Sequence, residues 1–154
     1  MTRVSRILRK RYAKAPFDGE GACRHGGRWS SPGVRLAYPS EHLSLAIIEY
    51  FVHIDRDDPP PDLVVATADV PDDVSRVDVA PARLPATWRQ TPAPAELAAI
   101  GDRFARARRA AILVVPSALV PDEFNWLLNP EHPDFRRLRI HPAEPFSYDA
   151  RFFA

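Results

Sequence analysis

Apolar residues recur at helical spacing in two parts of the chain. In 41–54, one stripe of apolar side chains faces one way and further apolar residues cover most of the opposite side. Spacing of three and four residues is typical of an α-helix, and a helix that is apolar nearly all round is predicted to be buried. Ser40 is its expected N-cap, because a serine hydroxyl can accept from a free backbone N–H. The second predicted helix, Glu96–Arg109, is amphipathic through Leu97, Ile100 and Phe104.

Shorter apolar runs predict strands. The run 111–115 (AILVV) is continuous, which is typical of a central strand covered on both faces. Shorter strands are expected at 34–38, 63–68 and 137–141, and the basic segment 1–14 is expected to be a first strand or turn whose arginines face solvent. The mixture predicts the α+β class. Its 154 residues fit a single domain, 1–154, against a norm of roughly 150 residues per domain.

Glycine and proline mark the irregular segments. Four of the six glycines fall between 19 and 27, which predicts a loop with sharp turns or a close approach to a neighbour. This loop matches neither a Walker loop nor a dinucleotide fingerprint. The other irregular segments are an exposed loop at 55–62, a proline-rich stretch at 69–94 anchored by Trp88, an ordered loop or short helix at 119–130, and an aromatic C-terminal tail at 145–153.

Composition and charge argue against several classes of function. The 21 basic and 20 acidic residues give a net charge of +1, so no overall field attracts nucleic acid or an anionic membrane. No apolar run resembles a signal peptide or reaches the roughly 18 residues that cross a bilayer. The single cysteine, Cys23, cannot form an internal disulfide, and we expect a reducing, cytoplasmic environment. The six basic side chains within 1–14 leave a local phosphate-facing patch as an alternative.

Two candidate sites rest on single features. His42, Glu49 and His53 share one side of the helix predicted at 41–54. Their spacing matches no zinc motif, so no metal is expected, and a plain contact between Glu49 and His53 is the simpler interpretation. Cys23 lies in the glycine loop beside basic residues, where a thiol can be activated. An incidental cysteine is the simpler interpretation there.

The combination of Arg28, Tyr38, Glu49 and Ser117 points to one kind of chemistry. Arg28 follows two glycines and can present its planar fork to a pyrophosphate. Tyr38 can stack on a flat heterocycle. A carboxylate such as Glu49 can hold a ribose hydroxyl and stabilise positive charge at an anomeric carbon, as in the loss of nicotinamide from NAD. Each residue also has a structural interpretation: a surface Arg28, a core Tyr38, a paired Glu49 and a capping Ser117.

Six runs of the chain resemble the RES-domain family, in the family's order. They are 19–33 (GEGACRHGGRWSSPG), 37–41 (AYPSE), 49–53 (EYFVH), 115–117 (VPS), 125–135 (NWLLNPEHPDF) and 145–151 (PFSYDAR). The family is named for an Arg, a Glu and a Ser, which fall on Arg28, Glu49 and Ser117. Its active-site tyrosine matches Tyr38, and Asn125 joins the set as a pocket residue through its motif alone.

The resemblance implies a function and partners. RES proteins are toxins of bacterial type II toxin–antitoxin pairs, with a core like that of diphtheria-toxin-like ADP-ribosyltransferases. They act on NAD, either degrading it by hydrolysis or phosphorolysis or transferring ADP-ribose to a protein. Their antitoxins carry an Xre-like helix-turn-helix domain and a domain that blocks the active site, so DNA is contacted only through the antitoxin. No membrane contact is expected, and a homodimer within the complex stays open.

The same resemblance assigns roles to the site residues. Arg28 holds the NAD phosphates and Tyr38 the nicotinamide side, while Glu49 holds the ribose hydroxyl and the developing cation. Ser117 hydrogen-bonds the nicotinamide or its ribose. NAD is therefore the expected substrate, and no metal is expected. Cys23 departs from the family, which more often has a small or basic residue there. Two alternatives stay open: a family member that has lost activity, and a non-catalytic module that binds RNA or DNA through its basic N-terminus.

Overall fold

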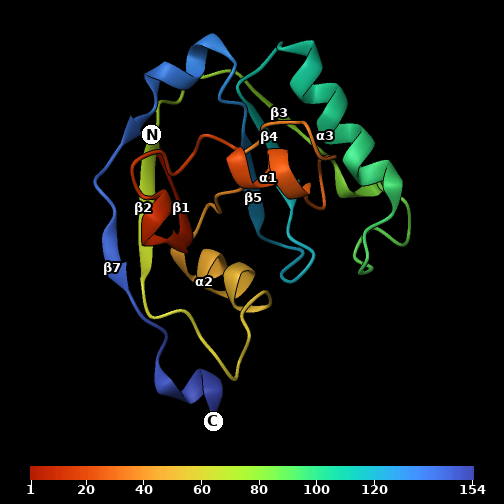
Figure 1. Ribbon diagram of the computed structural model, residues 1–154. Coiled ribbons are helices and arrows are strands. Elements are labelled where there is room, and N and C mark those ends of the chain that lie inside the picture. Colours follow the sequence, from red (N-terminus) through yellow and green to blue (C-terminus); the bar gives the residue numbers. More distant parts are fainter.

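Two β-sheets and three α-helices form the computed structural model, which describes all residues 1–154 (Figure 1). In the first sheet, β1 (Thr2–Arg9) pairs along its whole length with antiparallel β2 (Leu63–Val70). The other side of β2 pairs with the short strands β6 (Arg139–Ile140) and β7 (Glu144–Phe146). In the second sheet, β4 (Ile112–Pro116) lies between parallel β3 (Arg76–Asp78) and antiparallel β5 (Phe124–Leu128).

The segment 37–40 joins the two sheets. Ser40 forms one antiparallel bridge with Asn125 of β5 and another with Ser5 of β1. The Ser40 amide donates to the Ser5 carbonyl oxygen at 2.8 Å, and the Ser5 amide donates to the Ser40 carbonyl oxygen at 2.9 Å. Because one residue is paired on both sides, this segment fixes how the two sheets meet.

The helices are α1 (Glu20–His25), α2 (Leu43–Phe51) and α3 (Ala95–Ala107). Four short 3₁₀ turns accompany them, at Lys10–Tyr12, Pro81–Arg83, Pro133–Arg137 and Ala150–Phe153. α2 packs on β1, and α3 lies on the side of the second sheet that faces away from β1 and β2 (Figure 1). None of these helices combines the length and the apolar character that crossing a bilayer demands.

Side chains of β4 alternate between two cores. Ile112 and Val114 point into a core shared with the first sheet. Leu113 and Val115 point into a second core beneath α3. The other buried members of this second core are Trp29, Leu36, Leu97 and Leu127. Because both faces of β4 are covered, every residue of the strand is buried and its sequence is a continuous apolar run.

α3 is fixed closely onto the loop that follows Arg28. A Cβ atom added at Gly101 would lie 1.6 Å from the Trp29 carbonyl oxygen, so only glycine permits this approach. One residue further, Asp102 accepts hydrogen bonds from the Ser31 amide at 2.8 Å and the Ser31 hydroxyl at 2.6 Å. The helix therefore acts as a support for the Arg28 segment.

The predicted strands at 63–68 and 111–115 and the predicted helix Glu96–Arg109 are confirmed, as β2, β4 and α3. The strand predicted at 137–141 is only the two-residue β6. Three predictions are wrong: 34–38 is extended but pairs only at Ala37, 19–27 contains α1, and 119–130 contains β5. The proline-rich stretch 69–94 also contains β3, which was not predicted. The glycines at 19 and 26 do make sharp turns, with φ of 74° and 73°, but at the two ends of α1.

α2 is shorter and more exposed than predicted. It begins at Leu43 with His42 at the N-cap position, because the backbone of Ser40 is already paired with both sheets. The side chains of Leu43, Ile48 and Val52 are 44%, 39% and 52% exposed. The apolar residues on both sides therefore do not make this a buried helix, and the prediction of burial is wrong.

The first strand is confirmed, and its arginines bind the chain itself. Arg3 and Arg9 form ion pairs with Asp69 and Asp62. Arg6 donates to the carbonyl oxygen of Pro16 at 2.7 Å. Burial lowers the pKa of the Arg6 guanidinium, and the nearby Asp18 carboxylate opposes this shift. These contacts neutralise two of the charges on which a phosphate-facing patch depends.

Candidate active site

Glu49 lies near the C-terminal end of α2 and is partly buried. Its Oε1 atom accepts hydrogen bonds from Ser117 Oγ at 2.6 Å and from Asn125 Nδ2 at 3.0 Å. Both donors are neutral, and none of the ion pairs in the structure involves Glu49. The fold thus holds a carboxylate with dipoles while leaving its charge without a counter-ion.

The C-terminal tail holds α2 in place beside this network. The ring of Phe51 packs against the rings of Tyr148, Phe152 and Phe153 at centroid distances of 5.6, 5.1 and 5.9 Å. The Tyr148 hydroxyl donates to the Ile47 carbonyl oxygen at 2.6 Å. The packing of an aromatic tail is therefore confirmed, and it anchors the helix two residues on either side of Glu49.

Ser117 directly follows β4 and is fully buried. Its Oγ atom accepts from the backbone amides of Leu119 and Val120, both at 3.1 Å. With both lone pairs occupied, the hydroxyl has only its proton left, and that proton is directed at Glu49. The turn after β4 thereby fixes the direction of this hydrogen bond.

Asn125 lies on β5 and uses both ends of its amide. Nδ2 donates to Glu49, and Oδ1 accepts from Ser40 Oγ at 2.6 Å. Ser40 is 1% exposed and belongs to the segment that joins the sheets. Sequence reasoning assigned Ser40 to a helix cap and missed this contact. The available signal was its position two residues after Tyr38 in an extended segment, because alternate residues of such a segment share a face.

The predicted contact between Glu49 and His53 is absent. His53 and His42 are exposed, and His42 lies 3.6 Å from Glu41 instead. The carboxylate of Glu49 turns toward the end of β4 and toward β5 instead. Residues on the same side of a helical wheel therefore do not always contact one another. No group of three or more His, Cys, Asp or Glu side chains is arranged to hold a metal ion.

Arg28 is anchored by the proline-rich segment. Its Nη1 atom donates to the carbonyl oxygens of Trp88 and Gln90 at 3.0 and 2.7 Å, and its Nη2 atom donates to Thr91 Oγ1 at 3.0 Å. An arginine has five N–H donors. The Nε donor and one Nη2 donor therefore form no hydrogen bond with the protein. Arg28 is partly buried, and Trp88 packs on the second core, as predicted for an anchor.

Tyr38 packs against the backbone on both sides of Arg28. Its hydroxyl lies 2.6 Å from Ser30 Oγ and accepts from the Trp29 amide at 3.2 Å. Burial raises the pKa of this hydroxyl to about 12, so it stays protonated at neutral pH. A Cβ atom at Gly27 would lie 2.7 Å from the Tyr38 oxygen. The glycine before Arg28 is therefore needed for the tyrosine to fit.

The five predicted site residues fall into two groups. Glu49, Ser117 and Asn125 are joined by direct hydrogen bonds. Arg28 and Tyr38 form the second group, through the backbone of the Trp29 segment. Ser40 links the groups, because it bonds Asn125 and lies on the same extended segment as Tyr38. Cys23, on α1 and partly exposed, has no part in either group.

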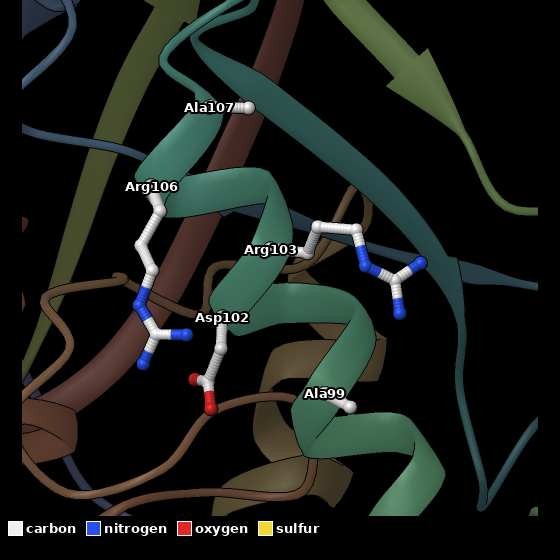
Figure 2. Close-up of a pocket in the computed structure, with 5 residues that line it drawn as sticks. All are labelled: Ala99, Asp102, Arg103, Arg106 and Ala107. Atoms are coloured by element: carbon white, nitrogen blue, oxygen red, sulfur yellow. The ribbon is translucent and has the colours of Figure 1, made fainter.

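Two cavities lie apart from these groups. One, of about 540 Å³, is a hollow on α3 lined by Ala99, Asp102, Arg103, Arg106 and Ala107. Figure 2 shows Asp102 and Arg106 on one side of the helix and Arg103 on another. The second, of about 410 Å³, is lined by residues such as Asp78, Val114 and Trp126. These belong to the opposite face of the second sheet from Asn125, since side chains alternate along β5.

Comparison with known proteins places these residues in a family. A family model described as "RES domain" matches residues 3–149. "Prs ADP-ribosylating toxin" of Sphingobium sp. is 35% identical over 142 residues, covering 91% of this chain and 88% of that protein. "Toxin Res" of Yersinia enterocolitica is 34% identical over 143 residues, covering 93% of each chain. "Toxin Res" of Pseudomonas putida is 35% identical over 150 residues, covering 96% of this chain and 99% of that protein.

A solved structure has the same fold. It is the crystal structure of the M. tuberculosis MbcT–MbcA toxin–antitoxin complex, with a TM-score of 0.78 and 16% identity. The match covers 95% of this chain and 84% of the other. The predicted α+β fold class is confirmed by this likeness and by the observed elements.

Proposed function

Because the chain belongs to the RES domain family, we propose that it is a toxin that consumes NAD by breaking the bond between nicotinamide and ribose. The toxin names of its relatives support this proposal. The observation that carries it is the arrangement of Glu49, which neutral donors hold and no cation neutralises. A carboxylate in that state is suited to a substrate that becomes positively charged during the reaction.

Glu49 acts on the ribose in this proposal. As nicotinamide departs, electrons leave the anomeric carbon and the ribose takes on oxocarbenium-like positive charge. The free Oε2 atom of Glu49 accepts a ribose hydroxyl, and the carboxylate stabilises the cation. Its two fixed donors keep it oriented, so little reorganisation is needed during the reaction.

Arg28 binds the pyrophosphate in this proposal. Its Nη1 atom is held by Trp88 and Gln90, which keeps the guanidinium plane fixed. The donors left on Nε and Nη2 are available to phosphate oxygens, and a planar guanidinium can contact two oxygens at once. Tyr38 lies beside Arg28 and is assigned to the nicotinamide side.

Ser117 and Asn125 complete the proposed site. In the structure the Ser117 proton goes to Glu49, so Ser117 acts first by orienting that carboxylate. A hydrogen bond from Ser117 to nicotinamide or its ribose stays a prediction, as does the place of Asn125 in the substrate pocket. No metal enters this scheme, and NAD is the substrate.

The group that attacks the ribose decides the product. Water gives ADP-ribose, inorganic phosphate gives its phosphorylated form, and a protein side chain gives an ADP-ribosylated protein. The name of the Sphingobium relative, "Prs ADP-ribosylating toxin", favours transfer to a protein as the second candidate function. All three begin with the same bond cleavage.

An antitoxin is the proposed partner. The toxin–antitoxin complex that shares this fold supports a partner of that kind, and the family resemblance suggests an Xre-like helix-turn-helix protein that blocks the active site. Direct binding of nucleic acid has less support, since the net charge is +1 and Arg3 and Arg9 are paired with aspartates.

The test is to incubate the purified protein with NAD, with and without phosphate and cell lysate, and to follow product masses. The proposal expects free nicotinamide in every case where turnover occurs. ADP-ribose, its phosphate or a protein heavier by one ADP-ribose then identifies the acceptor. Intact NAD under all conditions, with folded protein, would contradict the proposal.

A further inference from the structure

Both the backbone and the side chain of Ser40 are fixed by hydrogen bonds, and none of these bonds caps a helix. Its backbone amide and carbonyl are both hydrogen-bonded to Ser5, at 2.8 and 2.9 Å. On its other side it forms an antiparallel bridge with Asn125 of β5. The side chain is 1% exposed, and its hydroxyl donates to Asn125 Oδ1 at 2.6 Å. A proton donor is thus fixed at the junction of the two sheets.

An asparagine amide has nearly the same shape after a 180° rotation, so its orientation depends on what each end meets. Here Oδ1 meets the Ser40 hydroxyl and Nδ2 meets Glu49 Oε1 at 3.0 Å. The rotated amide would place an oxygen against the carboxylate, where two acceptors repel. The carboxylate of Glu49, which can only accept, therefore selects the observed orientation, and the Ser40 hydroxyl anchors the amide at its other end by donating to Oδ1.

We propose that Ser40 is a positioning residue, whose hydroxyl fixes the Asn125 amide so that its NH₂ group is presented to Glu49. It acts through Asn125 and does not touch the substrate. Ser117, which directly follows β4, holds the same Oε1 atom, so the carboxylate is oriented from two separate segments of the chain. This inference rests on the proposed function for its kinetic consequence, but not for its structural one.

The structural consequence can be measured without activity. The chain contains two asparagines and one glutamine, so an NMR spectrum holds only three side-chain amide pairs. The Asn125→Ala variant identifies the Asn125 pair by its disappearance. In the Ser40→Ala variant, we expect the Asn125 NH₂ to exchange faster with solvent, because the amide is then held only at its Nδ2 end, by Glu49. The Asn129 pair, which bonds the Ala105 carbonyl, should not change and reports that the variant is folded.

The kinetic consequence is a loss in kcat with little change in KM. One net hydrogen bond corresponds to roughly 2- to 12-fold, and we expect a fall in kcat of that size for Ser40→Ala. In an Asn125→Ala background, Ser40→Ala should cause no further fall, because the hydroxyl no longer has the amide to hold. Ser44→Ala, at an exposed serine of α2, is the matched control.

The outcomes separate this inference from the proposed function. A protein without turnover refutes the function, and the amide spectrum still tests Ser40. An Asn125 pair that is unchanged in Ser40→Ala overturns the inference, as does a full additional loss of kcat in the Asn125→Ala background. If Ser40→Ala does not fold, Ser40→Cys keeps a weak donor of similar shape and should give a smaller change of the same kind. Wild-type amide exchange in that variant overturns the inference.

Discussion

The carboxylates of Glu49 and Asp69 are both held by hydrogen bonds, but the donors to Glu49 are neutral, whereas Asp69 is paired with the charged Arg3. Asp69 on β2 is 4% exposed and binds Arg3 Nε at 2.8 Å and His141 Nε2 at 2.7 Å. These contacts, with Arg3 first, hold the pKa of Asp69 well below its usual range. Glu49 on α2 binds a serine hydroxyl and an asparagine amide, with no ion pair.

The difference indicates what each carboxylate is for. The charge of Asp69 is compensated inside the protein, and its partners come from β1 and from the residue after β6, so it ties three strands together. The dipoles around Glu49 stabilise its charge without cancelling it. Its field therefore remains available to a cation, which is what the proposed cleavage of NAD at the ribose requires.

The largest expected effect is on growth. Expression without an antitoxin should stop growth and lower cellular NAD, because the four residues Arg28, Tyr38, Glu49 and Ser117 are all present. Glu49→Ala or Arg28→Ala should relieve the arrest, while Asp69→Asn should not. Culture density and NAD content measure the effect. Normal growth with confirmed soluble expression and unchanged NAD would refute the toxin assignment.

The next largest effect is on NAD affinity. It tests whether Arg28 is the positively charged residue that binds the NAD phosphates. If Arg28 binds phosphate with two donors, Arg28→Lys loses that geometry although it keeps the charge. Hydrogen bonds to charged groups contribute about 1.5–3 kcal/mol, or roughly 10- to 150-fold in binding. Calorimetric titration of NAD into the two proteins, each carrying Glu49→Gln to suppress turnover, measures the difference. Equal affinity would make Arg28 a support for the Trp88 segment only.

A smaller effect, on stability, tests how the Tyr38 ring packs against Gly27. In Gly27→Ala, the added methyl group would lie 2.7 Å from the Tyr38 oxygen and 2.9 Å from Cζ, so the ring must move away from Ser30 and Trp29. Overpacking of this kind lowers the free energy of unfolding by about 1–3 kcal/mol. Gly21→Ala is the control, because nothing lies within 4 Å of its added Cβ. Equal thermal unfolding of both variants would contradict the packing described.

The smallest effect on activity is expected at Asp69. Asp69→Asn should leave NAD turnover unchanged and lower stability at neutral pH. Because the pKa of Asp69 is lower in the folded protein, its contribution is present above the unfolded pKa of roughly 4 and is lost as pH falls through the lower folded value. Denaturant unfolding against pH should therefore show the wild type and the variant converging in acid. A constant gap would assign Asp69 another role.

Several elements were predictable because their burial is uniform. β4 is covered on both faces and α3 on one, so a continuous apolar run and a helical period identify them. β3 was missed because all three of its residues are exposed and its neighbours are rich in proline. β5 was missed because Asn125 interrupts its apolar residues. The side chain of that asparagine donates a hydrogen bond to Glu49.

The candidate site residues were proposed from the sequence, but the contacts among them depend on strand register. Ser40 meets Asn125 across 85 positions and Arg28 meets Gln90 across 62. Contacts between residues so far apart in the sequence cannot be predicted from local sequence patterns. The incorrect pairing of Glu49 with His53 came from helical spacing alone, which gives neighbours on one helix and not the strands that face it.

The most direct test of the contrast between the two carboxylates is the rate of nicotinamide release by Glu49→Gln. Glutamine keeps an acceptor for Ser117 and Asn125 but removes the charge. Turnover should fall by roughly 10²-fold or more, the scale for losing one preorganised electrostatic partner. NAD affinity should stay within several-fold, and the melting temperature should stay near that of the wild type. Near-normal turnover with a lower melting temperature would show instead that Glu49, like Asp69, is a structural carboxylate.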